Sequence, residues 1–562
     1  NGPSLQSLGV SSDSVKRLLA LAGALGVPVS TAAVPADRVN TNASFLSRFD
    51  WAPNVSSRAG NVLYLLIGGT WADNEGARSG ATALPSHGGD TKNSALQAQV
   101  TSSRFVGTIL NEANLSVVTG STRTTPYLFL PDARILVNSS FPDGSAGSST
   151  LRVGGNANAE SDSHNSSVQL RNETSWFTMN NKHQFKVSID GRADRDRATQ
   201  SANRLGSFSF NSLADFAAAT PASFTRTLRA RETSGSQLLG ALGLGDIYRP
   251  VPALRIQYGV RIEGNTFGEN PALNPTVASL FGRNTSDVPG ALTFAPMVGF
   301  TRSYQSHGGG NFTGGIREYV GTLSSQAVEG VLRPTGLPDA VQQITCVGSA
   351  VPTPTWAAYA AAQGAVPSQC ADGSAGSSFS QSTPPVSTFA PGYGPSRRWG
   401  TSLGWNGRIG VNSRWIVSAV LNYSINQHRP GSFDLNFSPV TRFVLGSEGG
   451  RPVYVAPTSI VAATGAVAST DSRRFPQFAQ VNELRADLRS EARQVTFGIV
   501  SAPSGRPRGA KLTASVRAFY TYSDNRDQTR GFGGPTSGDP RSVEWRESGL
   551  PRHALQLLGP PQ

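Results

Sequence analysis

Cysteines and long apolar runs are scarce in this sequence, and each shortage excludes a class of structure. Only two of the 562 residues are cysteine, and neither lies near a histidine or another cysteine that would complete a metal site. No segment reaches the roughly 18 apolar residues that a transmembrane helix needs. Residue 1 is Asn, and no signal peptide follows it, so we expect a mature product or an internal fragment. Any insertion into a membrane would therefore use β-strands.

Motifs of catalysis and of metal or phosphate binding are also lacking. The sequence has no His-Glu-x-x-His, no Gly-x-Ser-x-Gly and no P-loop, so we expect no enzyme activity, cofactor or metal. Two copies of Asp-Gly-Ser-Ala-Gly-Ser-Ser, at Asp143–Ser149 and Asp372–Ser378, either bind Ca²⁺ or act as flexible loop filler, which is the favoured interpretation. The histidines are scattered singly and are interpreted as solvated: His87, His164, His183, His307, His428 and His553.

Lysine is rare, yet the net charge is +13 and the isoelectric point is near 10.1. Nearly all of the positive charge is therefore arginine, which pairs bidentately with carboxylate and phosphate. The arginines are dispersed along the chain and form no basic patch, so we predict no nucleic-acid partner. Two explanations remain open. The arginines line a channel or meet anionic lipid headgroups, or a GC-rich genome encodes Arg in place of Lys.

Glycine and proline are abundant, at 61 and 36 residues, and only 15% of the residues are charged, which favours strands joined by turn-rich loops. One helix is predicted at Ser14–Leu25, with Ser12 or Asp13 as N-cap and Gly26 as its stop. It lies in a Pro-rich region, residues 1–40, that we expect to be an extracellular loop.

The clearest pattern is an alternation of apolar and polar residues. From Leu254 to Glu263 every second residue is apolar, and similar sets begin near Phe185, Trp415 and Leu512. Such a strand has one apolar and one polar face. The alternation fits a soluble sandwich with its apolar face inward and a membrane barrel with its apolar face toward lipid equally well.

The connections between strands favour the barrel. Short turns alternate with long polar loops, as in bacterial barrels, and aromatic residues gather beside the turns, as in an interfacial girdle. These aromatic residues are Trp51, Trp176, Phe177, Tyr248 and Trp415. The turns are predicted near Ala52–Ser56, Ser102–Arg104, Thr178–Lys182, Arg249–Ala253, Gln305–Gly310, Arg408–Ser413 and Ser504–Gly509. They imply an all-β fold, a large antiparallel transmembrane β-barrel of about fourteen strands within this chain.

The two cysteines, Cys346 and Cys370, lie in a stretch rich in Gly, Ala and Pro. A disulfide that closes a loop is the favoured interpretation, with two free thiols as the alternative. A disulfide would indicate an oxidising compartment.

Several ordered segments resemble TonB-dependent outer-membrane receptors of the Oar-like class, which carry a carboxypeptidase-regulatory-like domain. The first is Phe208-Ser-Phe-Asn-Ser-Leu-Ala-Asp-Phe216, followed by Pro221-Ala-Ser-Phe224. The second runs from Gly245-Asp246 through Arg249-Pro250 to Tyr258-Gly259-Val260-Arg261. The residues that carry the resemblance are Phe208, Phe210, Leu213, Asp215, Pro221, Phe224, Asp246, Arg249, Pro250, Tyr258, Gly259 and Arg261.

Later segments are similar to the same family, and the resemblance covers most of residues 40–555. Asp434-Leu435-Asn436, Gly538-Asp539-Pro540 with Trp545, and Arg552-His553 resemble late-barrel pieces. The chain departs from the family at Met297, where an Arg is usual, and at Gly314–Tyr319, which only partly resembles the next strand.

The resemblance implies a 22-stranded barrel around a plug domain, energised through an N-terminal TonB box. No plug is evident here, so residues 41–562 are expected to be a partial barrel whose missing N-terminus would meet the TonB-type complex. The implied function is import of a scarce, bulky nutrient: a metal chelate, an oligosaccharide or a peptide. Expected partners are outer-membrane lipid, lipopolysaccharide and a surface lipoprotein. Ligand binding is expected in loops such as Arg197–Ser236 and the Cys346–Cys370 region.

Two rival interpretations remain. The first is an outer-membrane or surface barrel that has an adhesive or structural role and transports nothing. The second is a secreted, soluble β-sandwich protein or hydrolase.

Overall fold

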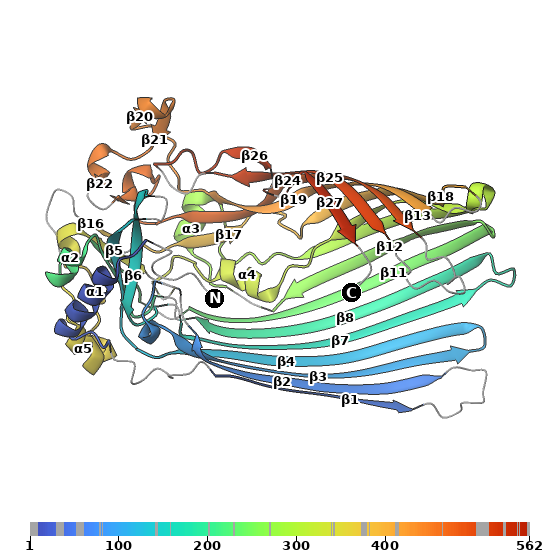
Figure 1. Cartoon of the computed structure of the whole chain (residues 1–562), viewed down its shortest axis with the longest axis horizontal. Helices are drawn as coiled ribbons and strands as arrows, with labels where there is room; N and C mark the ends of the chain where they lie inside the picture. The colour runs from blue at the N-terminus through green and yellow to red at the C-terminus, as the bar shows by residue number, and fades with distance from the viewer. Residues whose placement is uncertain are drawn as a thin grey trace, which may run out of the picture.

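A large antiparallel sheet dominates the computed structural model of the chain (Figure 1). The structure describes residues 9–29, 39–51, 61–77, 80, 82–140, 144–157, 159–200, 203–228, 231–268, 271–338, 340, 343–371, 379–381, 383–410, 415–462, 465–501, 516–531, 536–547, 549 and 551–558. Within these residues the sheet has seventeen strands, of which three are short, so the fourteen long strands match the number of about fourteen predicted from the sequence.

The long strands follow one another in chain order, each antiparallel to the next. They are β1 (Asn40–Trp51), β2 (Val62–Ala77), β3 (Gly89–Val106), β4 (Ile109–Pro126), β7 (Ser161–Phe177), β8 (His183–Gln200), β11 (Arg231–Val251), β12 (Leu254–Phe267), β13 (Ala291–Tyr304), β14 (Gly310–Val320), β18 (Arg397–Arg408), β19 (Trp415–Asp434), β24 (Val481–Ser501) and β25 (Arg517–Arg530).

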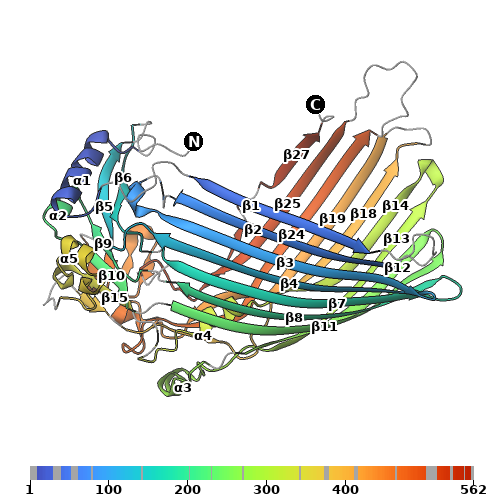
Figure 2. The ribbon, with the colours of Figure 1, turned by 90° about the horizontal axis from the view of Figure 1, so that it is seen from below.

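The three short strands lie near the end of this meander. Strands β26 (Val543–Glu547) and β27 (His553–Leu558) both pair with β25, and β17 (Val386–Phe389) runs parallel to β24. The sheet curls, so that the early and the late strands form two layers that face each other, and we call the side of the sheet between these layers the lumen (Figures 1 and 2). Within the described residues no pairing joins β1 to β26 or β27.

The two faces of this sheet differ in chemistry, as the alternation predicts. Leu242 of β11 lies opposite Ile189 on one neighbouring strand and Ile262 on the other, and Leu242 and Ile189 are 37% and 56% exposed. We call this apolar, exposed face the outer face. The opposite, inner face carries residues such as Asp190 and Arg261, and it faces the lumen.

Helix α4 (Ser325–Leu332) identifies the inner side of the sheet. It lies between the two layers of strands (Figure 1), next to β11, β8 and β17. The Ser325 hydroxyl donates a hydrogen bond to the Asp196 carboxylate of β8. The register also places four of the predicted girdle residues, Trp51, Trp176, Tyr248 and Trp415, on the outer face, beside the tight turns. The fifth, Phe177, lies opposite Gln184 on the inner face, so the girdle prediction is wrong for this residue.

Several predicted boundaries are wrong by a few residues. The turn expected at Ser102–Arg104 falls at Gly107 instead, because β3 and β4 continue pairing to Val106 and Ile109. Gly107 has a φ of +64°, a conformation that suits glycine. The predicted turns at Ala52–Ser56 and Ser504–Gly509 lie outside the described residues, as does part of the one at Arg408–Ser413.

A second, six-stranded sheet lies at one end of the large sheet (Figure 1). It is built from three connections of the large sheet, those between β4 and β7, between β8 and β11, and between β14 and β18. Its strands run in the order β16 (Phe379–Gln381), β15 (Gln343–Val347), β10 (Ser223–Thr227), β9 (Ser207–Phe210), β5 (Asp132–Ser140) and β6 (Ala146–Gly154). Helices α1 (Ser12–Ala24), α2 (Leu213–Ala217) and α5 (Trp356–Ala361) lie beside it. We call this unit the end domain.

The helix predicted near the start of the chain belongs to the end domain. Helix α1 begins two residues earlier than expected, because Ser11 is the N-cap and its hydroxyl accepts a hydrogen bond from the Ser14 amide. Leu18 and Ala22 bury their side chains in the core of the end domain. Helix α1 is therefore part of a packed unit.

The remaining elements are short and lie in loops. They are α3 (Pro275–Phe281), β20 (Phe443–Leu445), β21 (Arg451–Val453), β22 (Ile460–Val461), β23 (Ala466–Val467), and the 3₁₀ turns η1 (Pro85–His87), η2 (Ser306–Gly308), η3 (Gly348–Ala350), η4 (Gln363–Ala365), η5 (Gly446–Glu448), η6 (Pro457–Ser459) and η7 (Ser469–Ser472). No helix in the described ranges is long and apolar enough to cross a membrane.

Candidate functional site: the lumen and the end domain

The first family-like segment forms the core of the end domain. Phe208, Phe210 and Phe224 are 0%, 2% and 0% exposed, and the Phe208 ring lies 4.4 Å from that of Phe224. Leu213 packs against the same core, and the Asp215 amide donates to the hydroxyl of the α2 N-cap, Ser212. These residues therefore have a structural role, and the spacing of the aromatic residues in this segment reflects how they pack in the core.

Pro221 belongs to the same segment, just before β10. The next amide, that of Ala222, donates to the Ser209 carbonyl and so joins the segment to β9. Gly206, with a φ of +83°, precedes β9, and a Cβ there would lie 2.5 Å from the Phe224 ring. Only glycine fits this close approach without displacing the ring.

The two cysteines form a disulfide in the end domain, with a Cα–Cα distance of 5.5 Å, as predicted. Cys346 lies on β15 and is fully buried, and Cys370 packs against the same core. The bond closes the segment that contains α5, whose Trp356 and Tyr359 contribute rings to that core.

A buried polar cluster attaches the β2–β3 loop to the end domain. His87 and Asp132 are 0% and 1% exposed, and His87 Nε2 donates to Asp132 Oδ1 across 2.9 Å. Arg134 Nε donates to Asp132 Oδ2 across 2.6 Å. Burial by itself raises the pKa of Asp132, but the His87 and Arg134 interactions outweigh it and hold that pKa below its usual value. The solvated state predicted for His87 is wrong, because this ring serves as a buried donor.

This cluster predicts that the end domain loses stability in acid. A carboxyl with a lowered native pKa contributes stability above its unfolded pKa of about 3.9, and the contribution is lost as the pH falls through the native value. We expect the protease resistance of the end domain to decline below about pH 4. In the Asp132→Asn variant the end domain should be less resistant to protease at pH 7 than in the parent, and its resistance should change less with pH. If the protease resistance of Asp132→Asn declines in acid as steeply as that of the parent, another group causes the acid sensitivity.

The second family-like segment separates onto the two faces of the sheet. On the outer face, Asp246 Oδ2 accepts a hydrogen bond from the Tyr258 hydroxyl across 2.7 Å and lies 2.6 Å from His183 Nδ1. The His183 ring stacks on Tyr248 at 4.5 Å. The Asp246 carboxylate is 4% exposed, so its neighbours cover it. His183 was expected to be a single, solvated residue, and its partner became visible only with the strand register.

On the inner face, Arg261 joins two strands. Its Nη1 donates to Asp190 Oδ2 on β8 across 2.6 Å, and its Nε donates to Glu263 Oε2 across 3.0 Å. Gly259 lies opposite Gly245, and a Cβ at 259 would lie 2.6 Å from the Leu244 carbonyl oxygen. Glycine therefore allows the close approach of these two strands.

Arg249 and Pro250 form the bulge at the turn between β11 and β12. The register of the two strands shifts between Tyr248 and Val251, and the Arg249 amide donates to the Lys182 carbonyl across 2.7 Å. Proline suits this bulge because it has no amide to donate to a neighbouring strand.

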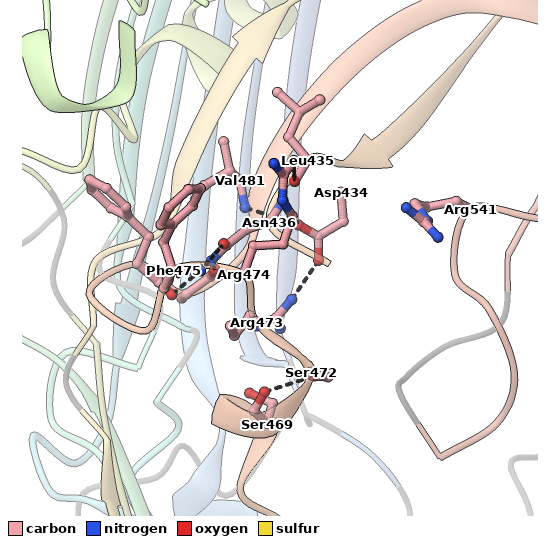
Figure 3. A network of polar contacts seen from close by, with 12 residues as sticks. Asp434, Leu435, Asn436, Ser469, Ser472, Arg473, Arg474, Phe475, Val481 and Arg541 are labelled. Carbon is pink, nitrogen blue, oxygen red and sulfur yellow. Dashed lines mark hydrogen bonds and ion pairs between the residues drawn. The ribbon is translucent and has the colours of Figure 1, made fainter. Parts of the chain in front are cut away.

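The Asp434-Leu435-Asn436 segment closes the base of the long loop between β19 and β24 (Figure 3). The side-chain Nδ2 of Asn436 donates to the carbonyls of Phe475, Phe478 and Ala479, and its Oδ1 accepts from the Phe475 backbone amide. Asp434 accepts from the Val481 amide, and Arg473 donates to it across 2.5 Å. This segment therefore has a structural role.

Two cavities lie along the inner face of the large sheet. The larger, of about 650 Å³, is bordered by β12–β14, β18, β19, β24 and β25, and the second, of about 600 Å³, by β7, β8 and β11–β14. The second is lined by Glu173, Lys186 and Glu263 among others, and Lys186 Nζ lies 2.5 Å from Glu173 Oε1. These cavities make the lumen, as well as the predicted loops, a candidate for ligand binding.

The described part of the chain contains no group of three or more His, Cys, Asp or Glu residues placed to hold a metal ion. The repeat at Asp372–Ser378 lies outside the described residues, as does Asp143 of the other copy, so the Ca²⁺ interpretation stays untested.

Comparison with known proteins identifies no family by sequence: no family model and no curated protein matches the chain. Solved structures do match. The outer membrane transporter YddB from Escherichia coli is 11% identical, with a TM-score of 0.48 over 89% of this chain and 52% of that chain. The siderophore receptor PirA from Pseudomonas aeruginosa is 8% identical, with a TM-score of 0.42 over 87% and 59%.

A third match is the ferripyoverdine receptor of the outer membrane of Pseudomonas aeruginosa. It is 9% identical, with a TM-score of 0.45 over 92% of this chain and 52% of that chain. The chain thus spans 52% to 59% of the length of these three structures.

Proposed function

We propose that this chain forms much of an outer-membrane β-barrel that imports a bulky nutrient, and that it is not an enzyme. The observation that carries the proposal is the opposite chemistry of the two faces of the large sheet. The outer face exposes side chains such as Leu242, Ile189 and Phe294, whereas the inner face is polar and borders cavities. A soluble sandwich buries its apolar face, so this arrangement favours lipid as the surrounding medium.

The end domain supports an extracellular binding role. Long loops of bacterial barrels lie outside the cell and the tight turns lie on the periplasmic side. With that orientation the end domain is extracellular, and its disulfide suits an oxidising compartment. Energisation by a TonB-type complex rests on the family resemblance alone, and so does the choice among a metal chelate, an oligosaccharide and a peptide.

The rival function is a barrel that transports nothing. The two lumen cavities favour transport, because an adhesive or structural role would not need cavities on the inner face. Lipopolysaccharide and a surface lipoprotein remain proposed partners.

A gene deletion in the native host tests the proposal. We expect poor growth when one class of metal chelate, oligosaccharide or peptide is limiting, and recovery when the gene is restored. A protonophore should abolish uptake of that nutrient. Unchanged growth on all three classes, with the protein still in the outer-membrane fraction, would favour the rival function.

A further inference from the structure

The larger lumen cavity has an unusual charge balance. Its lining includes the two arginines Arg317 and Arg398 but no aspartate or glutamate. The second cavity differs, because Arg171, Lys186 and Arg261 there have carboxylate partners. The larger cavity therefore carries positive charge that no carboxylate of its own lining balances, although Arg317 and Tyr319 also border the second cavity, where Glu263 lies.

The two arginines are held against one aromatic ring. The Arg317 guanidinium carbon lies 4.4 Å from the Tyr319 ring centre, and that of Arg398 lies 4.9 Å from it. Arg398 faces Tyr319 across the β14–β18 pair, and Arg317 faces Gly400. A Cβ at Gly400 would lie 3.0 Å from the Tyr319 ring, so glycine makes room for that ring.

Among the described residues neither Arg317 nor Arg398 forms an ion pair with a carboxylate. Stacking on an aromatic ring orients a guanidinium and leaves its N–H groups available to a ligand in the plane of the group. Both guanidiniums adjoin one ring, so a single multiply charged anion can contact both.

The rest of the lining supplies uncharged hydrogen-bonding groups. Asn422 lies opposite Gln494 on β24, and Gln494 lies opposite Ser523 on β25, all on the inner face. Asn525 and Ser402 line the same cavity. Amides and hydroxyls of this kind donate to oxyanions without adding the negative charge that would repel them.

We propose that the cavity around Arg317, Tyr319 and Arg398 is a binding site for a multiply charged oxyanion, carrying carboxylate or phosphate groups. The inference rests on the proposed transport function and narrows its substrate to an anionic compound that passes through the lumen. Arg317 and Arg398 would bind the anion directly, and Tyr319 would position them.

Calorimetric titration of pyrophosphate and of citrate into the full chain, folded in detergent micelles, tests the site. We expect at least one probe to bind, and Arg317→Gln and Arg398→Gln each to weaken that binding about tenfold, since each removes charge-assisted hydrogen bonds. The two probes separate phosphate from carboxylate preference. Arg302→Gln removes one positive charge on the outer face and should leave the affinity unchanged.

Two results would overturn the site: neither probe binds the folded chain, or the double variant Arg317→Gln/Arg398→Gln binds as tightly as the parent. Heat-modifiable gel mobility of each variant shows whether the barrel has folded, so a folding failure is recognised separately. If the folded barrel binds neither probe but still restores growth of the deletion strain, the anion site is wrong and the proposed transport function is unaffected.

Discussion

Phe208→Ala should lower the free energy of unfolding of the end domain by about 3–5 kcal/mol, because it removes a fully buried aromatic side chain from a packed core. The Phe208 ring contacts Phe224 on β10 and both Trp356 and Tyr359 on α5, at centroid distances of 4.4, 5.7 and 6.3 Å. Its loss would therefore weaken the contact between two loops that are distant in the sequence.

Limited proteolysis at neutral pH measures this effect. We expect cleavage within the end domain of Phe208→Ala while the large sheet keeps its heat-modifiable gel mobility. Leu136→Ala is the matched control, because Leu136 lies in the same unit but is 38% exposed. Equal protease resistance of Phe208→Ala and Leu136→Ala would contradict a packed end domain.

Asn436→Ala should release the base of the loop between β19 and β24. The substitution removes four hydrogen bonds to the backbone of a fully buried site, and each buried backbone group left unpaired costs about 1–3 kcal/mol. The separate costs do not add fully, so we expect a loss of about 3 kcal/mol or more.

Hydrogen exchange of the amides around Phe475 and Val481 reports this release directly (Figure 3). Exchange there should accelerate at least about a hundredfold in Asn436→Ala, following the expected loss of stability. Amides at the centre of β11 should keep their protection. Ser438→Ala, in the same loop, is the control. A variant with unchanged exchange at Phe475 would show that other contacts hold the loop.

Alternation along the sequence was sufficient to predict the long strands, because each strand repeats the same two-residue period over many positions. Leu254 to Glu263 is an example: its apolar residues occupy the outer face and Arg261 the inner face. The ends of strands were less predictable. Pairing between β3 and β4 continues through polar residues such as Ser102 and Arg104, whose composition resembles that of a turn.

The end domain could not be predicted as a unit, since its core joins residues from segments that carry no shared pattern. Leu18, Ile135, Phe208 and Trp356 meet in one cluster although they lie far apart in the chain. The Phe-rich segment at Phe208 resembled a known family, but its burial was not apparent. The disulfide was predictable because the chain offers only one pair of cysteines.

The sequence also did not predict which side chains meet across neighbouring strands. His183 contacts Asp246, and Arg398 contacts Tyr319, only because the register of neighbouring strands places them opposite or nearly opposite one another. A one-residue shift in register would move each of these side chains to the other face of the sheet. Sequence alternation determines a face but not a partner.

Spin labelling along β11 tests most directly whether the outer face meets lipid. Labels would be placed singly at Leu238, Leu242 and Leu244 on the outer face, and at Leu239, Ala241 and Gly243 on the inner face, with the full chain in bilayers. We predict that relaxation by oxygen, which concentrates in lipid, is strong at the outer positions, and that relaxation by a water-soluble nickel complex is strong at the inner ones. Equal access of the nickel complex to both sets, or the opposite alternation, would contradict a membrane barrel.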